Sequence, residues 1–140
     1  MNLLIERSDD LDACLAIRFT VFVEEQSVPI EEERDHYDQN AIHILATQQG
    51  TPVGTARIVV ADDIGKIGRV AVLASHRGTG LGAKLIHACL AELRAQSDVT
   101  KAKLGSQTHA LGFYEKLGFV AQGPEFDDAG IPHRMMSLSL

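Results

Sequence analysis

The segment from Arg69 to Ala83 constrains the fold more than any other part of the chain, because an apolar run leads into alternate glycines. Residues 70–73 are all apolar and predict a strand buried on both faces. The glycines at 78, 80 and 82 follow, and helical spacing predicts a helix over 79–95. First-turn amides of a helix lack internal partners and carry partial positive charge. With Arg77 beside them, these features predict a pyrophosphate site.

Two familiar phosphate motifs do not match this loop. A P-loop ends in Gly-Lys-Ser or Gly-Lys-Thr, whereas Gly82 is followed by Ala83 and no Ser or Thr follows Lys84. A dinucleotide fingerprint needs Gly-x-Gly-x-x-Gly near the start of a βαβ unit, whereas this Gly-x-Gly-x-Gly loop comes after three predicted strands. The alternative without a ligand is a tight strand-to-helix turn. Because Arg77 and the helix start coincide with the glycines, we favour the anion site.

The rest of the chain predicts one domain over residues 1–140. Strands are expected over 2–7, 41–47, 53–61, 66–73, 101–105, 119–123 and 135–140. Helices are expected from a cap at Ser8 to about Glu24, over 79–95, and from a cap at Thr108 to a stop at Gly118. The polar segments 24–40 and 124–133 are expected to be long loops, the first with one helical turn. We therefore expect an α/β (α+β) domain with a mixed central sheet flanked by helices.

Composition argues against several functional classes. The formal net charge of −6 disfavours nucleic-acid binding, which usually shows a basic surface. No apolar run is long enough to span a bilayer, and the start of the chain does not resemble a signal peptide. Cys14 and Cys89 fall on apolar helix faces, where cysteine acts as a small core residue. The histidines lack metal-ligand spacing. We therefore expect a cytoplasmic protein with no membrane partner and no metal.

Two motifs together resemble the GNAT superfamily of N-acetyltransferases. The run Arg77-Gly78-Thr79-Gly80-Leu81-Gly82-Ala83 is similar to the family's Gln/Arg-x-x-Gly-x-Gly/Ala signature. The run Phe113–Phe119 is similar to its Tyr-x-x-x-Gly-Phe element. One predicted helix and one strand separate the two motifs, as in the family. The runs Arg18–Pro29 and Gly130–His133 also resemble a small bacterial branch typified by the ElaA and YjcF proteins.

The resemblance implies a mixed sheet of about six to seven strands and acetyl-CoA as the cosubstrate. The acetyl group would pass to a primary amine of a small molecule by direct attack in a ternary complex. The pantetheine arm would pair with the strand edge, where an N–H near Val72 would polarise the thioester carbonyl. Gln107 lies where many members have Asn. The implied cofactor-binding residues are Val70, Ala71, Val72, Arg77, Gly78, Thr79, Gly80, Leu81, Gly82, Ala83, Gln107 and Tyr114.

Two proton transfers accompany this chemistry. Tyr114 matches the family tyrosine and is the candidate general acid for the leaving thiolate, although its spacing from Ala110 and Leu117 also suits a packing residue. The candidate bases for the amine are Glu25, His109 and Glu125, each equally compatible with a solvated or structural role. The acidic segment 24–36 either attracts a cationic amine or is a solvated loop.

Two other functions fit part of the pattern. A non-catalytic acetyl-CoA sensor would keep the glycine loop and lose the proton-handling groups, so Tyr114 favours an enzyme. An acyltransferase with another acyl donor or acceptor is disfavoured by the short chain, which has no further apolar pocket segment. The family resemblance also implies a homodimer.

Overall fold

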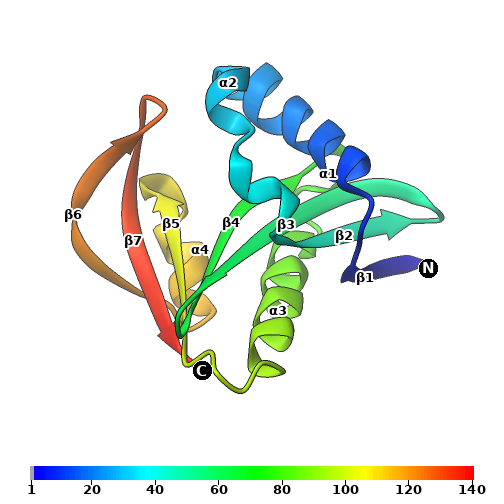
Figure 1. Ribbon diagram of the computed structural model, residues 1–140. Coiled ribbons are helices and arrows are strands. Elements are labelled where there is room, and N and C mark those ends of the chain that lie inside the picture. Colours follow the sequence, from blue (N-terminus) through cyan, green and yellow to red (C-terminus); the bar gives the residue numbers. More distant parts are fainter. Residues whose placement is uncertain (1) are drawn as a thin grey trace.

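A single mixed sheet of seven strands runs through the computed structural model, which describes residues 2–140 (Figure 1). The strands are β1 (Leu3–Arg7), β2 (Ile42–Gln48), β3 (Thr51–Ala61), β4 (Ile64–Val72), β5 (Lys101–Gln107), β6 (Val120–Asp128) and β7 (Ile131–Ser139). Their spatial order is β1-β2-β3-β4-β5-β7-β6. Every neighbouring pair is antiparallel except β4 and β5, which are parallel. The predicted α/β class and mixed sheet are confirmed.

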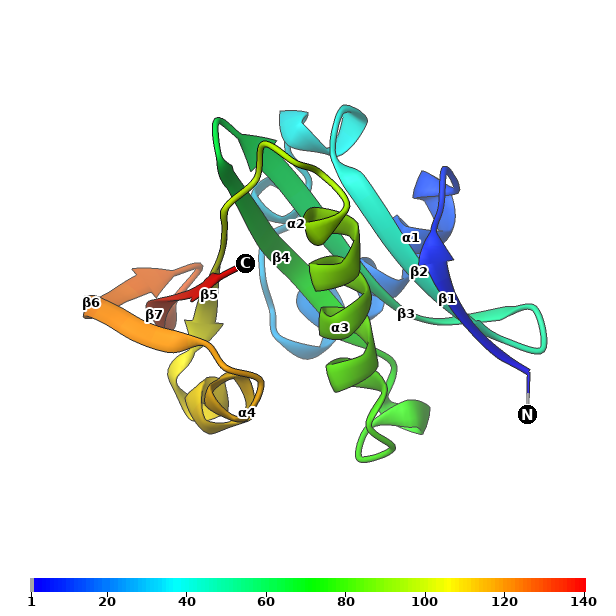
Figure 2. The same ribbon diagram turned by 90° about the horizontal axis from the view of Figure 1, so that it is seen from below.

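Helices cover both faces of this sheet (Figure 2). They are α1 (Leu11–Arg18), α2 (Ile30–Glu33), α3 (Leu81–Arg94) and α4 (Leu111–Lys116), with the π-helical segment η1 (Phe19–Glu25) continuing α1. Shorter 3-10 turns are η2 (His36–Gln39), η3 (Ala74–His76) and η4 (Thr108–Ala110). The helices α3 and α4 lie on one face, whereas α1 and η1 lie on the other. No helix within residues 2–140 has the length and apolar character to cross a membrane.

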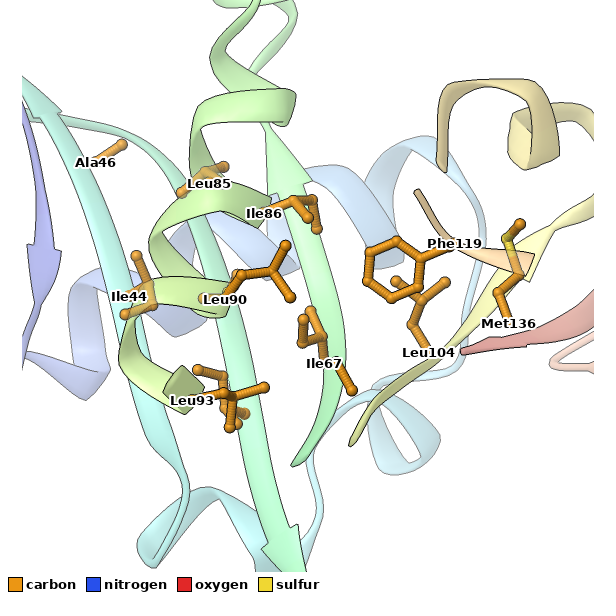
Figure 3. Close-up of a cluster of buried hydrophobic side chains, with 14 of the residues drawn as sticks. Ile44, Ala46, Ile67, Leu85, Ile86, Leu90, Leu93, Leu104, Phe119 and Met136 are labelled. Carbon is orange, nitrogen blue, oxygen red and sulfur yellow. The ribbon is translucent and has the colours of Figure 1, made fainter. Parts of the chain in front are cut away.

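The main core lies between α3 and the sheet. Figure 3 shows Leu85, Ile86, Leu90 and Leu93 of α3 beside Ile44 and Ile67 of the strands. These are positions that the apolar spacing of 79–95 predicts to be buried. Cys89 is also buried there, and Cys14 lies in a smaller cluster under α1. Both cysteines therefore pack as small apolar residues.

Several predicted helix boundaries were wrong. Asp10 caps α1 by accepting a hydrogen bond from the Ala13 amide at 3.1 Å, whereas the Ser8 hydroxyl accepts from the Asp10 amide. Thr108 begins the 3-10 turn η4 and does not cap α4. The expected loop 24–40 contains both α2 and η2. The turn η2 begins at a capping box formed by Asp35 and Asp38, a local signal that the polar composition of the segment obscured.

The segment 124–133, expected to be a loop, forms the turn and the adjoining parts of both strands of a β-hairpin. Strands β6 and β7 pair up to Asp128 and Ile131, and the turn uses Ala129 and Gly130 at positive φ. Proline and acidic residues in this segment suggested a loop. Because β6 is an edge strand, it tolerates Pro124 and charged side chains that a central strand would not.

Strands β4 and β5 separate after a short paired stretch. Their parallel pairing covers only Ile64–Lys66 with Lys101–Lys103. Farther along β4, Arg69 and Val70 lie opposite the single residue Ala56 of β3, and Arg69 has a φ of +50°. This β-bulge bends the strand and increases its twist. Backbone groups of both strands beyond the paired stretch therefore face one another without sharing a ladder (Figure 1).

Candidate active site

A cavity of about 400 Å³ lies where β4 and β5 separate. Ile67–Val70 of β4 and Leu104–Gln107 of β5 form two of its sides. Tyr114 of α4 lines it from one face of the sheet, and Gln26 and Val28, which follow η1, line it from the other. Residues of the β6–β7 hairpin complete the wall. The cavity thus connects both faces of the sheet through the gap between the two strands.

The glycine loop leads into α3 beside this gap. Gly80 is the N-cap of α3 with a φ of +86°, and Gly78 has a φ of +76°. A Cβ atom at either position would meet nothing within 4 Å, so backbone conformation, not crowding, favours glycine there. No side chain within residues 2–140 caps the first turn of α3. The geometry therefore explains the glycines as a turn, and it leaves the first-turn amides of α3 without a side-chain cap, as an anion site would require.

Gly82 has a different role from the two glycines before it. It lies in the first turn of α3, and a Cβ atom there would be 3.4 Å from the ring of Phe113. That is an ordinary van der Waals distance, so the first turn of α3 packs beside the Phe113 ring of α4, the helix that carries Tyr114. The two sequence motifs therefore meet in space across one helix–helix contact.

Arg77 lies at the open edge of β4. Its Nε donates to the Val72 carbonyl at 3.0 Å, and its Nη2 donates to Glu25 Oε1 at 2.5 Å. Glu25, at the end of η1, was one of the candidate bases, and here it neutralises the cation of the glycine loop. Arg77 and Glu25 thus join the two faces of the site.

The backbone of Val72 faces the gap between the strands. The Leu73 amide donates to the Val53 carbonyl of β3 at 3.0 Å. Backbone groups of successive residues in a strand point to opposite edges. The N–H and C=O of Val72 therefore point away from β3, which is the orientation that the sequence-based role of this amide requires.

Gln107 connects the end of β5 to the segment after η1. Its Nε2 donates to Gln26 Oε1 at 2.9 Å, and its Oε1 accepts from His109 Nε2 at 2.6 Å. A second hollow beside the cavity is lined by Glu25, Arg77, Gln107 and His109. Glu125, on the exposed strand β6, lines neither hollow. The structure therefore brings Glu25 and His109 together near the gap, but not Glu125.

Tyr114 lines the cavity with its ring packed edge-on against Phe113 and Phe119. Its hydroxyl has no hydrogen-bond partner in the described part of the chain. Burial, with a smaller contribution from the charge of Cys89, raises the pKa of Tyr114 to about 12. The phenol therefore stays protonated at neutral pH and can donate a hydrogen bond.

His133 was missed as a site residue by the sequence analysis. It is a buried residue of β7 that lines the cavity and stacks on Phe126, with ring centroids 5.7 Å apart. Its Nδ1 donates to the Ile131 carbonyl at 2.7 Å, which leaves Nε2 as the acceptor of the neutral ring. The alternation Ile131, His133, Met135 would have revealed this inward position if the segment had been predicted as a strand.

Three of the six carboxylates in the acidic segment 24–36 pair with arginines. These are Glu25, Glu33 and Asp35. The expected attraction of this segment for a cationic amine is correspondingly reduced, because half of its negative charge is already balanced. Among residues 2–140, no three His, Cys, Asp or Glu side chains are grouped as metal ligands would be.

Comparison with known proteins assigns the chain to a family. The profile of the Acetyltransferase (GNAT) domain matches residues 10–140. A candidate acetyltransferase of Bacillus subtilis is 43% identical over 136 residues, covering 95% of this chain and 92% of that protein. The uncharacterized N-acetyltransferase YjcF of B. subtilis is 38% identical over 95% of both chains, and Escherichia coli ElaA is 33% identical over 88% and 83%.

Solved structures agree with these relatives. A candidate N-acetyltransferase from Lactobacillus plantarum superposes with a TM-score of 0.91 at 27% identity, covering 100% of this chain and 99% of that chain. A GNAT acetyltransferase from Elizabethkingia anophelis with acetyl-CoA bound shares the fold at a TM-score of 0.77 and 15% identity, covering 99% of both chains. The chain therefore belongs to the GNAT acetyltransferase family, with YjcF and ElaA among its homologues.

Proposed function

We propose that this protein is an acetyl-CoA-dependent N-acetyltransferase that acetylates a primary amine of a small molecule in a ternary complex. The observation that carries the proposal is the separation of β4 and β5 over a cavity open to both faces of the sheet. A thioester entering from the α3 face and an amine entering from the α1 face could meet there without passing one another. Bound acetyl-CoA in a protein of the same fold supports this arrangement.

The cosubstrate would be held mainly by backbone groups. The first-turn amides of α3, preceded by Gly78 and Gly80, suit the pyrophosphate. The Val72 amide faces the gap, where it can donate to the thioester carbonyl as negative charge develops on its oxygen. Arg77 would exchange its bond to Glu25 for a phosphate oxygen.

In the reaction, the amine nitrogen attacks the carbonyl carbon, and the bond from carbon to sulfur breaks. The proton lost by the amine is taken by His133 Nε2, whose tautomer is set by the Ile131 carbonyl. The departing thiolate accepts a hydrogen bond from the Tyr114 hydroxyl. We prefer His133 to Glu25 and His109 as the base, because those two side chains already bond to Arg77 and Gln107.

The test combines calorimetry with acetyl-CoA and an assay of thiol release over a panel of primary amines. We expect heat on titration of acetyl-CoA and thiol release that depends on an added amine. His133→Asn keeps a donor for the Ile131 carbonyl and removes the acceptor nitrogen, so turnover should fall by about 10²-fold while the heat persists. Heat without thiol release for any amine would favour a sensor, and the absence of heat would refute the proposal. Release from a longer acyl-CoA alone would favour another acyl donor.

A further inference from the structure

Two arginines that line the cavity, Arg57 and Arg69, have N–H groups without a hydrogen-bond partner among the described residues. Arg18, Arg57 and Arg69 meet Glu33, Asp35 and Asp38 in one cluster over the sheet. Arg18 is fully buried, and its Nε, Nη1 and Nη2 all donate to Glu33 or Asp38 at 2.7–3.2 Å. Arg18 therefore has a purely internal role, and the cluster has equal numbers of cations and anions.

Arg57 differs from Arg18 because only one of its nitrogens is engaged. Its Nη1 donates to Asp35 at 2.6 Å and to Asp38 at 3.1 Å, while Nε and Nη2 have no partner within residues 2–140. The side chain is only 9% exposed, yet none of its unpartnered nitrogens is sealed from solvent. Arg57 is a lining residue of the cavity, so we infer that these two solvent-accessible donors face the space inside it.

Arg69 adds a further free donor beside Arg57. Its Nε donates to Glu33 and its Nη2 to Asp35, which leaves Nη1 without a partner among the described residues. Arg69 lies on the β-bulge of β4, and Gly68, the residue before it, is the register partner of Arg57 on β3. The bulge and its positive φ thus present Arg69 on the cavity side, next to Arg57.

The free guanidinium donors favour an anion at this position. Lys66, Glu32 and Asp128 also line the cavity, and all three are exposed, where solvent screens their charges. The preference for an anion therefore rests on Arg57 and Arg69. Forked guanidinium donors match the two oxygens of a carboxylate.

We propose that the acceptor is an amine that also carries a carboxylate, which binds Arg57 and Arg69 while the amine faces His133. This inference rests on the proposed acetyltransferase function and names the class of its acceptor. The cavity is also lined by the apolar side chains of Phe22, Val28, Phe126 and Met135. An acceptor with an apolar chain between its amine and its carboxylate could pack against them.

The test compares ω-amino acids with alkylamines in which a methyl group replaces the carboxylate, with chains of two to six methylenes. We expect kcat/KM for the amino acids to exceed that of their methyl counterparts by about 10-fold or more, with a clear optimum of chain length. Methyl esters of the same amino acids should behave like the alkylamines. Equal rates for both series would overturn the inference and leave the acetyltransferase proposal standing.

Arg57→Lys is the most selective variant. A lysine can keep one bond to Asp35 and Asp38, so the cluster persists, but the two free donors are lost. We expect KM for the best amino acid to rise by about 10-fold or more, so that its advantage in kcat/KM over the methyl counterpart is largely lost. Arg7→Lys, at an exposed position on β1, is the matched control and should change nothing.

A binding measurement separates the two proposals. If neither series releases thiol, calorimetry of the amino acids against protein saturated with CoA tests the site directly. Heat with the amino acids that is lost with the alkylamines and in Arg57→Lys would support the carboxylate site. No heat with any amino acid, or the same heat in Arg57→Lys, would overturn it.

Discussion

The buried surroundings of Tyr114 determine what its hydroxyl can do in the reaction, because they change its pKa. Burial raises its pKa to about 12, well above the value of about 8.5 for an ordinary thiol. Complete proton transfer from this phenol to a departing thiolate is therefore uphill. We therefore expect Tyr114 to donate a hydrogen bond that strengthens as negative charge develops on sulfur. This role does not require Tyr114 to lose its proton.

Replacing Tyr114 by Phe should lower kcat by about 10²-fold, the low end of the range for a proton donor. The ring packing against Phe113 and Phe119 is kept, so acetyl-CoA affinity and thermal stability should be unchanged. Because the pKa is raised, the wild-type rate should show no tyrosine ionisation below about pH 11. Steady-state kinetics and calorimetry check these points, and unchanged turnover in the variant would exclude Tyr114 from the mechanism.

At the scale of elements, the start of α3 depends on backbone conformation that only glycine adopts easily. Gly80 has a φ of +86° and ends the loop that begins at the tip of β4. Gly50, in the turn between β2 and β3, has a nearly equal φ of +82°, and a Cβ atom there would also meet nothing within 4 Å. The two glycines share one conformational requirement and differ only in their distance from the proposed pyrophosphate site.

Gly80→Ala and Gly50→Ala should therefore each lower the free energy of unfolding by about 1 kcal/mol, the cost of a left-handed alanine. Only Gly80→Ala should weaken acetyl-CoA binding, because the added methyl group and the displaced amides lie where the pyrophosphate would bind. Urea unfolding and calorimetry measure the two effects. Equal acetyl-CoA affinity in both variants would mean that the loop is a turn without a binding role.

For the whole molecule, the ion cluster joins segments far apart in the chain. Arg18 of α1, Glu33 of α2, Asp38 of η2 and the arginines of β3 and β4 meet only in the folded protein. Burial opposes the ionisation of Asp38, but hydrogen bonds and charge from Arg18, joined by Arg57, outweigh it and lower the pKa to about 2. Asp38 therefore stabilises the fold above its ordinary pKa of 3.8 and loses this contribution as pH falls toward 2.

Asp38→Asn should lower the free energy of unfolding at pH 7 by about 3–5 kcal/mol, because it leaves Arg18 short of a buried partner. Between pH 4 and pH 2 the wild type should lose about 2 kcal/mol that the variant does not lose. Asp98→Asn, at an exposed residue, is the control and should follow the wild type. Denaturant unfolding at several pH values measures both effects, and a variant with the pH dependence of the wild type would contradict the assignment.

The order of strands and helices could be predicted from the sequence because periodicity and turn chemistry are local properties. The segment 81–94 is helical and buried on its apolar side, as expected, and the motif residues 77–83 and 114–119 lie on elements that touch. The homodimer and the cytoplasmic location are still predictions, and light scattering in solution would test the first.

What the sequence determined by itself is the family, the mixed sheet and the glycine-led start of α3, since each depends on neighbouring residues or on motif spacing. The tertiary structure alone decided which charged and titratable groups meet. Arg77 pairs with Glu25 across 52 positions, and His133 reaches the cavity only because 124–133 forms a hairpin. The free donors of Arg57 exist because Asp35 and Asp38 occupy only one of its nitrogens. Such pairings follow from the packing of distant segments, and no local pattern encodes them.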